Sequence, residues 1–268
     1  MSFFRAAVLT AAVSLFSMPA FALQCGNTSS GFDVWKRDFA QLAKNNGVGQ
    51  RGLNALAQAR YSTKTISADR NQKGVKYALN DFIRIRLGSH DGFASQARKR
   101  KAANPKFFAA VEQRYGVPSG ILLAIHGMET GFGKFMGSEP VISSITTVAY
   151  DCRRSEFFIP HAIAALQMVD RGMLSPSQLG AFHGELGHTQ FLPGNAMKYG
   201  ADGNGDGAVD FYYWPDALAS TANFLRAKGW QPGQPYGEGT ANFRVLNEWN
   251  AATVYQQAIA LSAERIDR

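Results

Sequence analysis

The chain has 268 residues, a formal net charge of +8 and only two cysteines. This length supports one sizeable domain, and the positive charge favours polyanionic partners such as lipid headgroups or bacterial wall polymers. The sequence contains no recognisable nucleic-acid motif and no long apolar run after its N-terminus, so we expect no nucleic-acid partner and no integral membrane segment in the mature chain.

The first 22 residues have the pattern of a secretory signal. Arg5 precedes an almost wholly apolar stretch, which ends in an Ala-x-Ala cleavage pattern at residues 20–22. The stretch is shorter than the roughly 20 residues that span a bilayer. We expect cleavage after Ala22 and a periplasmic mature chain. A lipoprotein is less favoured, because Gln24 precedes Cys25 where a lipid-acceptor cysteine normally follows a small residue.

The two cysteines, Cys25 and Cys152, are far apart in the sequence. In an oxidising compartment such a pair favours a disulfide, which would join the mature N-terminus to the middle of the chain. Two free thiols are the alternative.

Most of the mature sequence has apolar residues at helical spacing, with proline in first turns and glycine after last turns. The predicted helices are Asp33 to Asn45, Arg51 to Ala59, Gln72 to Leu87, Pro105 to Tyr115, a helix opened by Pro118 that carries Ile121 to Glu129, Ser155 to Arg171, and Pro215 to Lys228. The run Arg98 to Lys101 is interpreted as a solvated helix end. Short strands are expected near Phe211 and over Phe243 to Leu246, and a loop over Gln231 to Thr240. The predicted class is mainly α with minor β.

The apolar run Ile121 to Met128 ends in one carboxylate, Glu129, followed by a glycine-punctuated turn. A half-buried carboxyl group has a raised pKa and can donate a proton at neutral pH. Acidic residues are mildly disfavoured at a helix C-terminus, so the position favours a functional role. The alternative is a solvated glutamate at a helix end.

The second segment of interest is glycine-rich and runs from Gly184 to Pro193. Its glycines permit close approach of the backbone, and His188 and Gln190 offer donors to a polar ligand. An ordinary tight turn is the alternative. His183, Glu185 and His188 superficially suggest zinc ligands, but they lack the His-Glu-x-x-His order that places two histidines on one helix face.

The third segment, residues 202–210, resembles a calcium-binding loop. Oxygen-bearing side chains occupy positions 1, 3, 5 and 9 of the loop, with glycine at position 6. These side chains belong to Asp202, Asn204, Asp206 and Asp210. Tyr213 stands at position 12, where a bidentate glutamate is expected, and Asp216 follows three residues later. Weak calcium binding and a metal-free turn rich in Asp and Asn both remain open.

The fourth segment is Asn247-Glu248-Trp249-Asn250, followed by Tyr255. An aromatic ring beside an amide can stack on a sugar face and bond an acetamido group. A tryptophan packed in the core is the alternative.

In order and spacing, these segments together resemble the lytic murein transglycosylase B family across nearly the whole mature chain. Glu129 to Gly133 resembles the family's catalytic motif, and Gly184 to Pro193 its glycine-rich motif ending in Gln-Phe-x-Pro. Trp249-Asn250 with Tyr255 resembles the late aromatic-Asn motif, and residues 216–225 the helix between them. His188-Thr189 departs from an aromatic-Gly pair of some members. Phe132 and Trp249 stand where other aromatic residues also occur.

The resemblance implies a lysozyme-like fold in one domain, residues 23–268, with a helical N-terminal lobe over about 23–104 and a catalytic core over about 105–268. It implies a monomeric lyase that needs no cofactor and acts on peptidoglycan glycan strands. Glu129 would act first as acid and then as base, forming 1,6-anhydro ends on N-acetylmuramic acid. Gln190, Trp249, Asn250, Phe132, His188 and Tyr255 would contact substrate.

Three other functions remain as alternatives. A lysozyme-type hydrolase would need a second carboxylate about 5 to 9.5 Å from the first, and Asp151 and Glu185 are the nearest candidates. A binding module without activity would hold glycan strands but would not need Glu129. A calcium-responsive structural protein would depend on the incomplete loop at Asp202.

Overall fold

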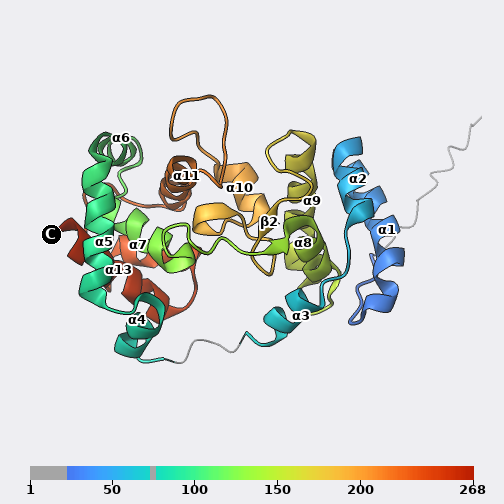
Figure 1. Cartoon of the computed structure of the whole chain (residues 1–268), viewed down its shortest axis with the longest axis horizontal. Coiled ribbons are helices and arrows are strands. Elements are labelled where there is room, and N and C mark those ends of the chain that lie inside the picture. Colours follow the sequence, from blue (N-terminus) through green and yellow to red (C-terminus); the bar gives the residue numbers. More distant parts are fainter. Residues whose placement is uncertain (1–22, 73–76) are drawn as a thin grey trace, which may run out of the picture.

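The computed structural model describes residues 23–72 and 77–268, and the predicted signal segment, residues 1–22, lies outside them. The described chain is mainly helical, and its helices form two groups that lie on opposite sides of Figure 1. Within these residues, no helix has both the length and the apolar character required to cross a bilayer.

The first group, called here the disulfide lobe, consists of α1 (Phe32–Asn45), α2 (Gln50–Gln58), α3 (Thr63–Arg70), α8 (Val141–Tyr150) and α9 (Ser155–Asp170). The second, the acid lobe, consists of α4 (Leu79–Leu87), α5 (His90–Ala103), α6 (Pro105–Tyr115), α7 (Ser119–Thr130), α11 (Trp214–Ala227), α12 (Ala241–Trp249) and α13 (Thr253–Asp267). Between them, α10 (Pro193–Tyr199) packs against both α9 and α11.

The lobes are interleaved in the sequence, which differs from the expected boundary near residue 104. In the structure α1, α2 and α3 pack with α8 and α9, whereas α4 and α5 pack against α7 and α13. Helices associate through matching apolar faces rather than through chain order, so sequence position alone does not fix the lobe to which a helix belongs.

Local signals account for many helix ends. The side chains of Ser62, Ser89 and Thr240 accept hydrogen bonds from backbone N–H groups in the first turns of α3, α5 and α12. Proline lies in the first turns of α6, α10 and α11. Gly116 and Gly131 end α6 and α7 in the left-handed conformation.

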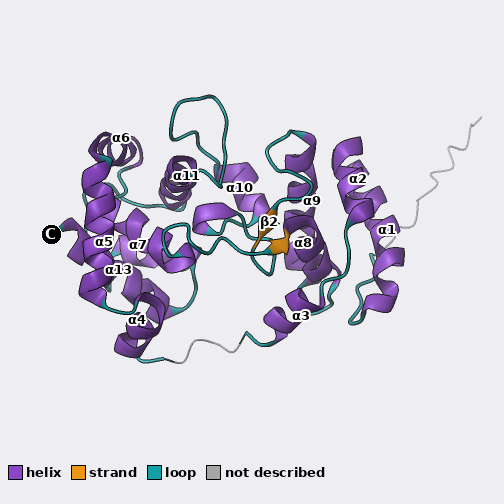
Figure 2. Cartoon of the chain, viewed as in Figure 1, coloured by secondary structure: helices purple, strands orange, loops and turns teal. Residues whose placement is uncertain are grey.

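The expected strands are wrong in position. Phe211 lies in a turn, and residues 243–246 lie within α12, where Phe243 and Leu246 are buried on one helix face. A four-residue apolar pattern cannot distinguish strand from helix. The N-cap hydrogen bond of Thr240 favours a helix over these residues. The strands of the described residues are instead β1 (Glu139–Pro140) and β2 (Leu179–Gly180), an antiparallel pair near the centre of the molecule (Figure 2).

The helix expected from Gln72 begins later, at Leu79, with Ala78 as an extended cap residue; residues 73–76 lie outside the described part of the chain. The basic run at residues 98–101 lies in α5, but it is more than a solvated end. Arg100 lies over the ring of Phe132, 4.1 Å from its centroid, and Lys101 pairs with Asp267 at 2.8 Å. The predicted loop at residues 231–240 is confirmed.

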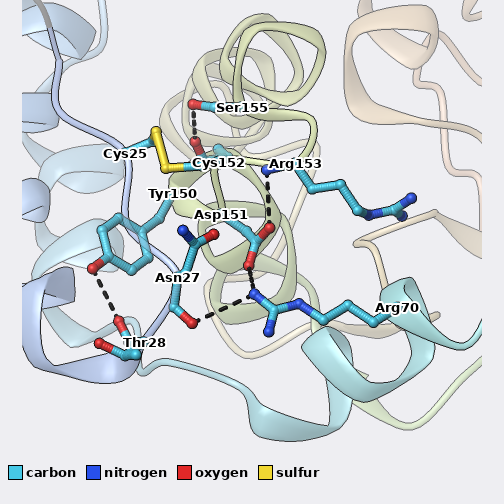
Figure 3. Close-up of a disulfide and its surroundings, with 10 residues drawn as sticks. Cys25, Asn27, Thr28, Arg70, Tyr150, Asp151, Cys152, Arg153 and Ser155 are labelled. Carbon is cyan, nitrogen blue, oxygen red and sulfur yellow. Dashed lines mark hydrogen bonds and ion pairs between the residues drawn. A yellow bond between two sulfur atoms is a disulfide. The ribbon is translucent and has the colours of Figure 1, made fainter.

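The structure contains the disulfide between Cys25 and Cys152 that the sequence analysis favoured (Figure 3). Backbone hydrogen bonds beside it join Gly26 to Tyr150 and Cys152, and the Tyr150 hydroxyl donates to the Thr28 carbonyl. The segment before α1 is therefore attached to the end of α8 by both covalent and hydrogen bonds.

Candidate active site

Glu129 is the half-buried residue of an otherwise buried helix end. Residues 119–128 and Thr130 of α7 are all buried, whereas Glu129 lies at the surface of a cleft. All residues of α7 except Glu129 are buried, because the helix is enclosed by neighbours and packs against α13, α5 and α11. The helix that carries the acid is thus held rigidly by the core of the acid lobe.

Two donors from distant parts of the sequence bond the same oxygen of Glu129. The Trp249 indole N–H donates to Oε1 at 3.0 Å, and the Tyr255 hydroxyl donates to Oε1 at 2.6 Å. Burial raises the pKa of Glu129, whereas the bonds from Tyr255 and Trp249 oppose that rise, and the net pKa lies above its ordinary value. A carboxyl group in this environment can keep its proton at a higher pH than an exposed glutamate.

The turn after Glu129 is fixed by Thr130. Its hydroxyl donates to the carbonyl of His188 at 2.7 Å and accepts from the N–H of Gly133 at 2.9 Å.

Two non-glycine residues near the site have positive φ, Phe132 at 62° and Gln190 at 54°. Such backbone strain costs about 1–3 kcal/mol per residue and is concentrated at functional sites.

The cleft beside Glu129 has a volume of about 270 Å³. It is lined by Glu129, Glu185, Gln190, Phe191, Leu192, Asn195, Phe224, Glu248, Trp249 and Asn250. The structure therefore brings together Glu129, Gln190, Trp249 and Asn250, which were predicted to be catalytic or substrate-binding, and also Glu185, a candidate second carboxylate. Tyr255 lies behind the acid, buried, with its hydroxyl on Oε1. The Gln190 amide is fixed by donating to the Gly187 carbonyl at 2.8 Å.

Phe132 and His188 do not line this cleft. They line a separate cavity of about 140 Å³ together with Arg100 and Trp214. His188 Nδ1 lies 3.0 Å from His126 Nε2, and a side chain at Gly133 would collide with the His188 ring. The two residues therefore support the turn after Glu129, and direct contact with a ligand in the cleft does not follow from their positions.

The two carboxylates considered as partners for Glu129 have different locations. Asp151 is buried beside the disulfide, where it pairs with Arg70 at 2.6 Å (Figure 3). Glu185 lines the cleft, with its carboxylate on His183. His183 and His188 bond different partners, and within the described ranges no three His, Cys, Asp or Glu side chains are grouped to hold a metal ion.

Asn195, Phe224 and Glu248 also line the cleft, although the sequence motifs predicted no role for them. Asn195 follows the glycine-rich motif, Phe224 lies within residues 216–225, and Glu248 directly precedes Trp249. Neighbouring positions in a motif could have indicated them, but which of those side chains faces the cleft depends on helix orientation.

The loop at residues 202–210 is closed by its own hydrogen bonds. The Asp202 carboxylate accepts from the N–H groups of Asn204, Gly205 and Gly207, and these bonds lower its pKa. Gly207, at the sixth position, has a φ of 86°. Asp216 is buried and accepts from the N–H groups of Gly203 and Asp210. The loop therefore has the turn geometry of a calcium loop, with Tyr213 still at its twelfth position.

A helical fold of two lobes, with one protonatable carboxylate at the end of a buried helix and in a cleft, defines the lysozyme-like class. The sequence profile of the Transglycosylase SLT domain family matches residues 31–240. The chain belongs to this family, which confirms the resemblance seen in the motifs.

Solved structures share the fold. SltB3 from Pseudomonas aeruginosa, in complex with NAG-anhNAM-pentapeptide, has a TM-score of 0.80 and 27% identity, covering 88% of this chain and 79% of that one. The Escherichia coli lytic transglycosylase SLT35, in complex with calcium, has a TM-score of 0.78 and 21% identity, covering 91% of this chain and 96% of that one.

Among curated proteins, the membrane-bound lytic murein transglycosylase B of Escherichia coli (strain K12) is 35% identical over 123 residues. The match covers 45% of this chain and 34% of that relative, so it spans about a third of the relative's length.

Proposed function

We propose that the protein is a periplasmic, monomeric lytic transglycosylase of peptidoglycan. It cleaves the β-1,4 bond between N-acetylmuramic acid and N-acetylglucosamine without water and leaves 1,6-anhydro ends. The observation that carries the proposal is the position of Glu129 at the surface of the cleft, where Trp249 and Tyr255 bond one of its oxygens and burial raises its pKa. SltB3, a relative with 27% identity, was solved with an anhydro-muramyl ligand, which supports the same substrate class.

Glu129 performs both proton transfers. Its protonated carboxyl donates to the oxygen that leaves the anomeric carbon, while the N-acetyl group of the muramyl sugar stabilises that carbon. The carboxylate then takes the proton of the C6 hydroxyl, whose oxygen attacks the anomeric carbon and closes the ring. Among the described residues, hydrogen bonds reach only Oε1 of Glu129, which leaves Oε2 to give and retrieve the proton.

The cleft supplies the remaining contacts. Trp249, Asn250 and Gln190 orient sugar rings and acetamido groups, in keeping with their places in the cleft wall. The positive net charge suits an anionic cell wall. The disulfide favours an oxidising compartment, and it occupies the Cys25 sulfur that a lipoprotein anchor would need.

Mass analysis of the products from purified peptidoglycan tests this proposal. We expect muropeptides that end in anhydro sugars. A lysozyme-type hydrolase is the second candidate, favoured by the presence of Glu185 in the same cleft. It would add one water, about 18 Da, to each product. Hydrated products from the wild-type protein would therefore identify it as a hydrolase rather than a transglycosylase. The absence of any cleavage would indicate a binding module.

The loop at Asp202 is proposed to hold a structural calcium ion weakly. Asp202, Asn204 and Asp206 supply side-chain oxygens and Gly207 the turn, while Asp210 already accepts from the N–H of Tyr212. Among the described residues, no three acidic side chains converge on a common metal position. Backbone and amide oxygens must therefore complete the coordination of the calcium ion, which makes a tight site unfavourable.

Calcium at about 10 mM is expected to raise the melting temperature relative to chelator, because a site with a Kd near 10⁻⁴–10⁻³ M adds about 1–3 kcal/mol at that concentration. Thermal unfolding of the wild type and of Asp202→Asn measures this. Magnesium is the control ion, and the shift should be absent in the variant. Identical melting in calcium and chelator would leave the loop as a metal-free turn.

A further inference from the structure

The cleft contains a second carboxylate that the proposed reaction does not yet use. Glu185 lies in the glycine-rich segment and lines the same cleft as Glu129. Its side chain is 22% exposed, so it is partly withdrawn from water. An isolated carboxylate in such a place would be costly, which requires partners that stabilise its charge.

His183 supplies those partners. Its backbone N–H donates to Glu185 Oε2 at 2.9 Å, and its ring Nδ1–H donates to Oε1 at 3.0 Å. Gly184 between them has a φ of 84°, and a Cβ there would lie 2.7 Å from Ile145 Cβ. Only glycine therefore allows the turn in which one residue holds both oxygens of the carboxylate.

His183 in turn lies against residues of the disulfide lobe. Its Nε2 lies 3.4 Å from Oδ1 of Asp69, a buried residue of α3. Asp69 accepts hydrogen bonds from Arg153 and Arg154, which follow Cys152. The ring of His183 also lies parallel to that of Phe158 in α9. A row of polar side chains thus runs from Glu185 through His183 to Asp69 and its two arginines, and it joins the cleft to the disulfide lobe.

The environments of the two carboxylates separate their protonation states. Burial raises the pKa of Glu185, but the hydrogen bonds and charge of His183 outweigh it, so its net pKa lies below the ordinary value. Burial raises the pKa of Glu129, and the charge of Glu185 raises it further. Two carboxyl groups whose pKa values are driven apart in one cleft can take the roles of a proton donor and a fixed anion.

We propose that Glu185 is a fixed anion of the active site, which stabilises positive charge at the anomeric carbon and strengthens Glu129 as a base in the second proton transfer. Glu185 forms no bond and exchanges no proton. When Glu129 has given its proton to the leaving oxygen, two negative charges share the cleft, and this repulsion favours return of a proton from the C6 hydroxyl to Glu129. The inference rests on the transglycosylase function proposed above.

Other charges near the pair must be considered in a pH experiment. The groups that affect Glu129 are Tyr255 of α13, Arg86 of α4 and Glu185 itself. Glu185 contacts His183, which lies beside Asp69, and Asp69 in turn pairs with Arg153 and Arg154. Glu248 of α12 also lines the cleft, but its charge is paired with Lys228 at 2.6 Å. Among the acidic groups that line the cleft with Glu129, Glu185 is therefore the one whose removal most directly changes the charge near Glu129.

The test is a pH profile of anhydro-product formation for Glu185→Gln and Glu185→Asp. The glutamine variant keeps the shape but removes the charge. It is expected to lower kcat about 10- to 100-fold with KM changed less than about threefold, because the charge acts on the transition state. The alkaline limb should move to lower pH, since Glu129 loses a neighbour that raises its pKa. The aspartate variant should restore the limb and part of the rate.

The matched control is Glu238→Gln, an exposed glutamate that bonds Gln257 outside the cleft; it should leave rate and pH profile unchanged. Circular dichroism confirms folding of each variant. If the wild type forms anhydro products but Glu185→Gln keeps its rate and pH profile, the inference is overturned. If wild-type products are hydrated and vanish in Glu185→Gln, Glu185 is a base for water instead. If the wild type cleaves nothing, the proposed function itself fails.

Discussion

Replacement of Glu129 by glutamine is expected to reduce the release of anhydro-muropeptides by about 10²- to 10⁴-fold, which is the usual contribution of general acid–base catalysis. Glutamine can still accept from Trp249 and Tyr255 through its amide oxygen, so the cleft should keep its shape. It cannot give a proton or take one back. Turnover of purified peptidoglycan, with binding to intact sacculi measured in parallel, separates lost chemistry from lost affinity.

The same variant has an expected signature in stability. The folded-state pKa of Glu129 is raised, so the stability that its protonated form contributes is fully present below the unfolded value and is lost as pH rises through the folded pKa. Glutamine does not ionise. The melting temperature of Glu129→Gln should therefore equal that of the wild type at about pH 4 and exceed it at about pH 8.

Two results would contradict this account of Glu129. One is activity within about threefold of the wild type, since acid–base catalysis contributes far more. The other is a variant that is less stable than the wild type at alkaline pH, which would mean that the carboxylate is stabilised by the fold. The exposed Glu238→Gln variant is the control for both measurements.

Removal of the disulfide by Cys25→Ser with Cys152→Ser is expected to lower the free energy of unfolding by about 2–5 kcal/mol. The bridge joins residues 127 apart in the sequence, and closing so long a loop restricts the unfolded chain strongly. Urea denaturation of oxidised, reduced and double-serine protein measures the effect. The reduced wild type should match the double variant.

Activity should respond differently from stability to this change. The disulfide lies in the lobe of α8 and α9 (Figure 3). Its cysteines are not among the residues that line the cleft of Glu129. At temperatures where the double variant is folded, we expect product formation close to that of the wild type. An unchanged unfolding free energy would show that the hydrogen bonds of Gly26 and Tyr150 alone hold the N-terminal segment.

Several features could be predicted because they depend on local pattern. The run from Ile121 to Met128 is apolar except for His126, so it favours a buried helix with Glu129 at its end. Other helices escaped prediction. α8 has the sequence VISSITTVAY, rich in β-branched residues, and forms a helix because all but one of its residues are buried by packing.

The motifs also predicted the positions of some candidate substrate residues but not of others. Gln190, Trp249 and Asn250 share the cleft with Glu129, and their motifs indicated a common site. His188 belongs to the same glycine-rich motif, but its ring faces His126. The motif gives the residue types, whereas the left-handed backbone at Gln190 sends successive side chains in different directions.

The sequence by itself determined the mainly helical class, the family and the single acid at the end of a buried helix, because these depend on short-range periodicity and ordered motifs. Only the tertiary structure decided that Trp249 and Tyr255 bond one oxygen of Glu129, and that Glu185, bonded by His183, lines the same cleft. Protonation states follow from burial and from charges brought near by packing, and the partners here lie up to 126 residues apart.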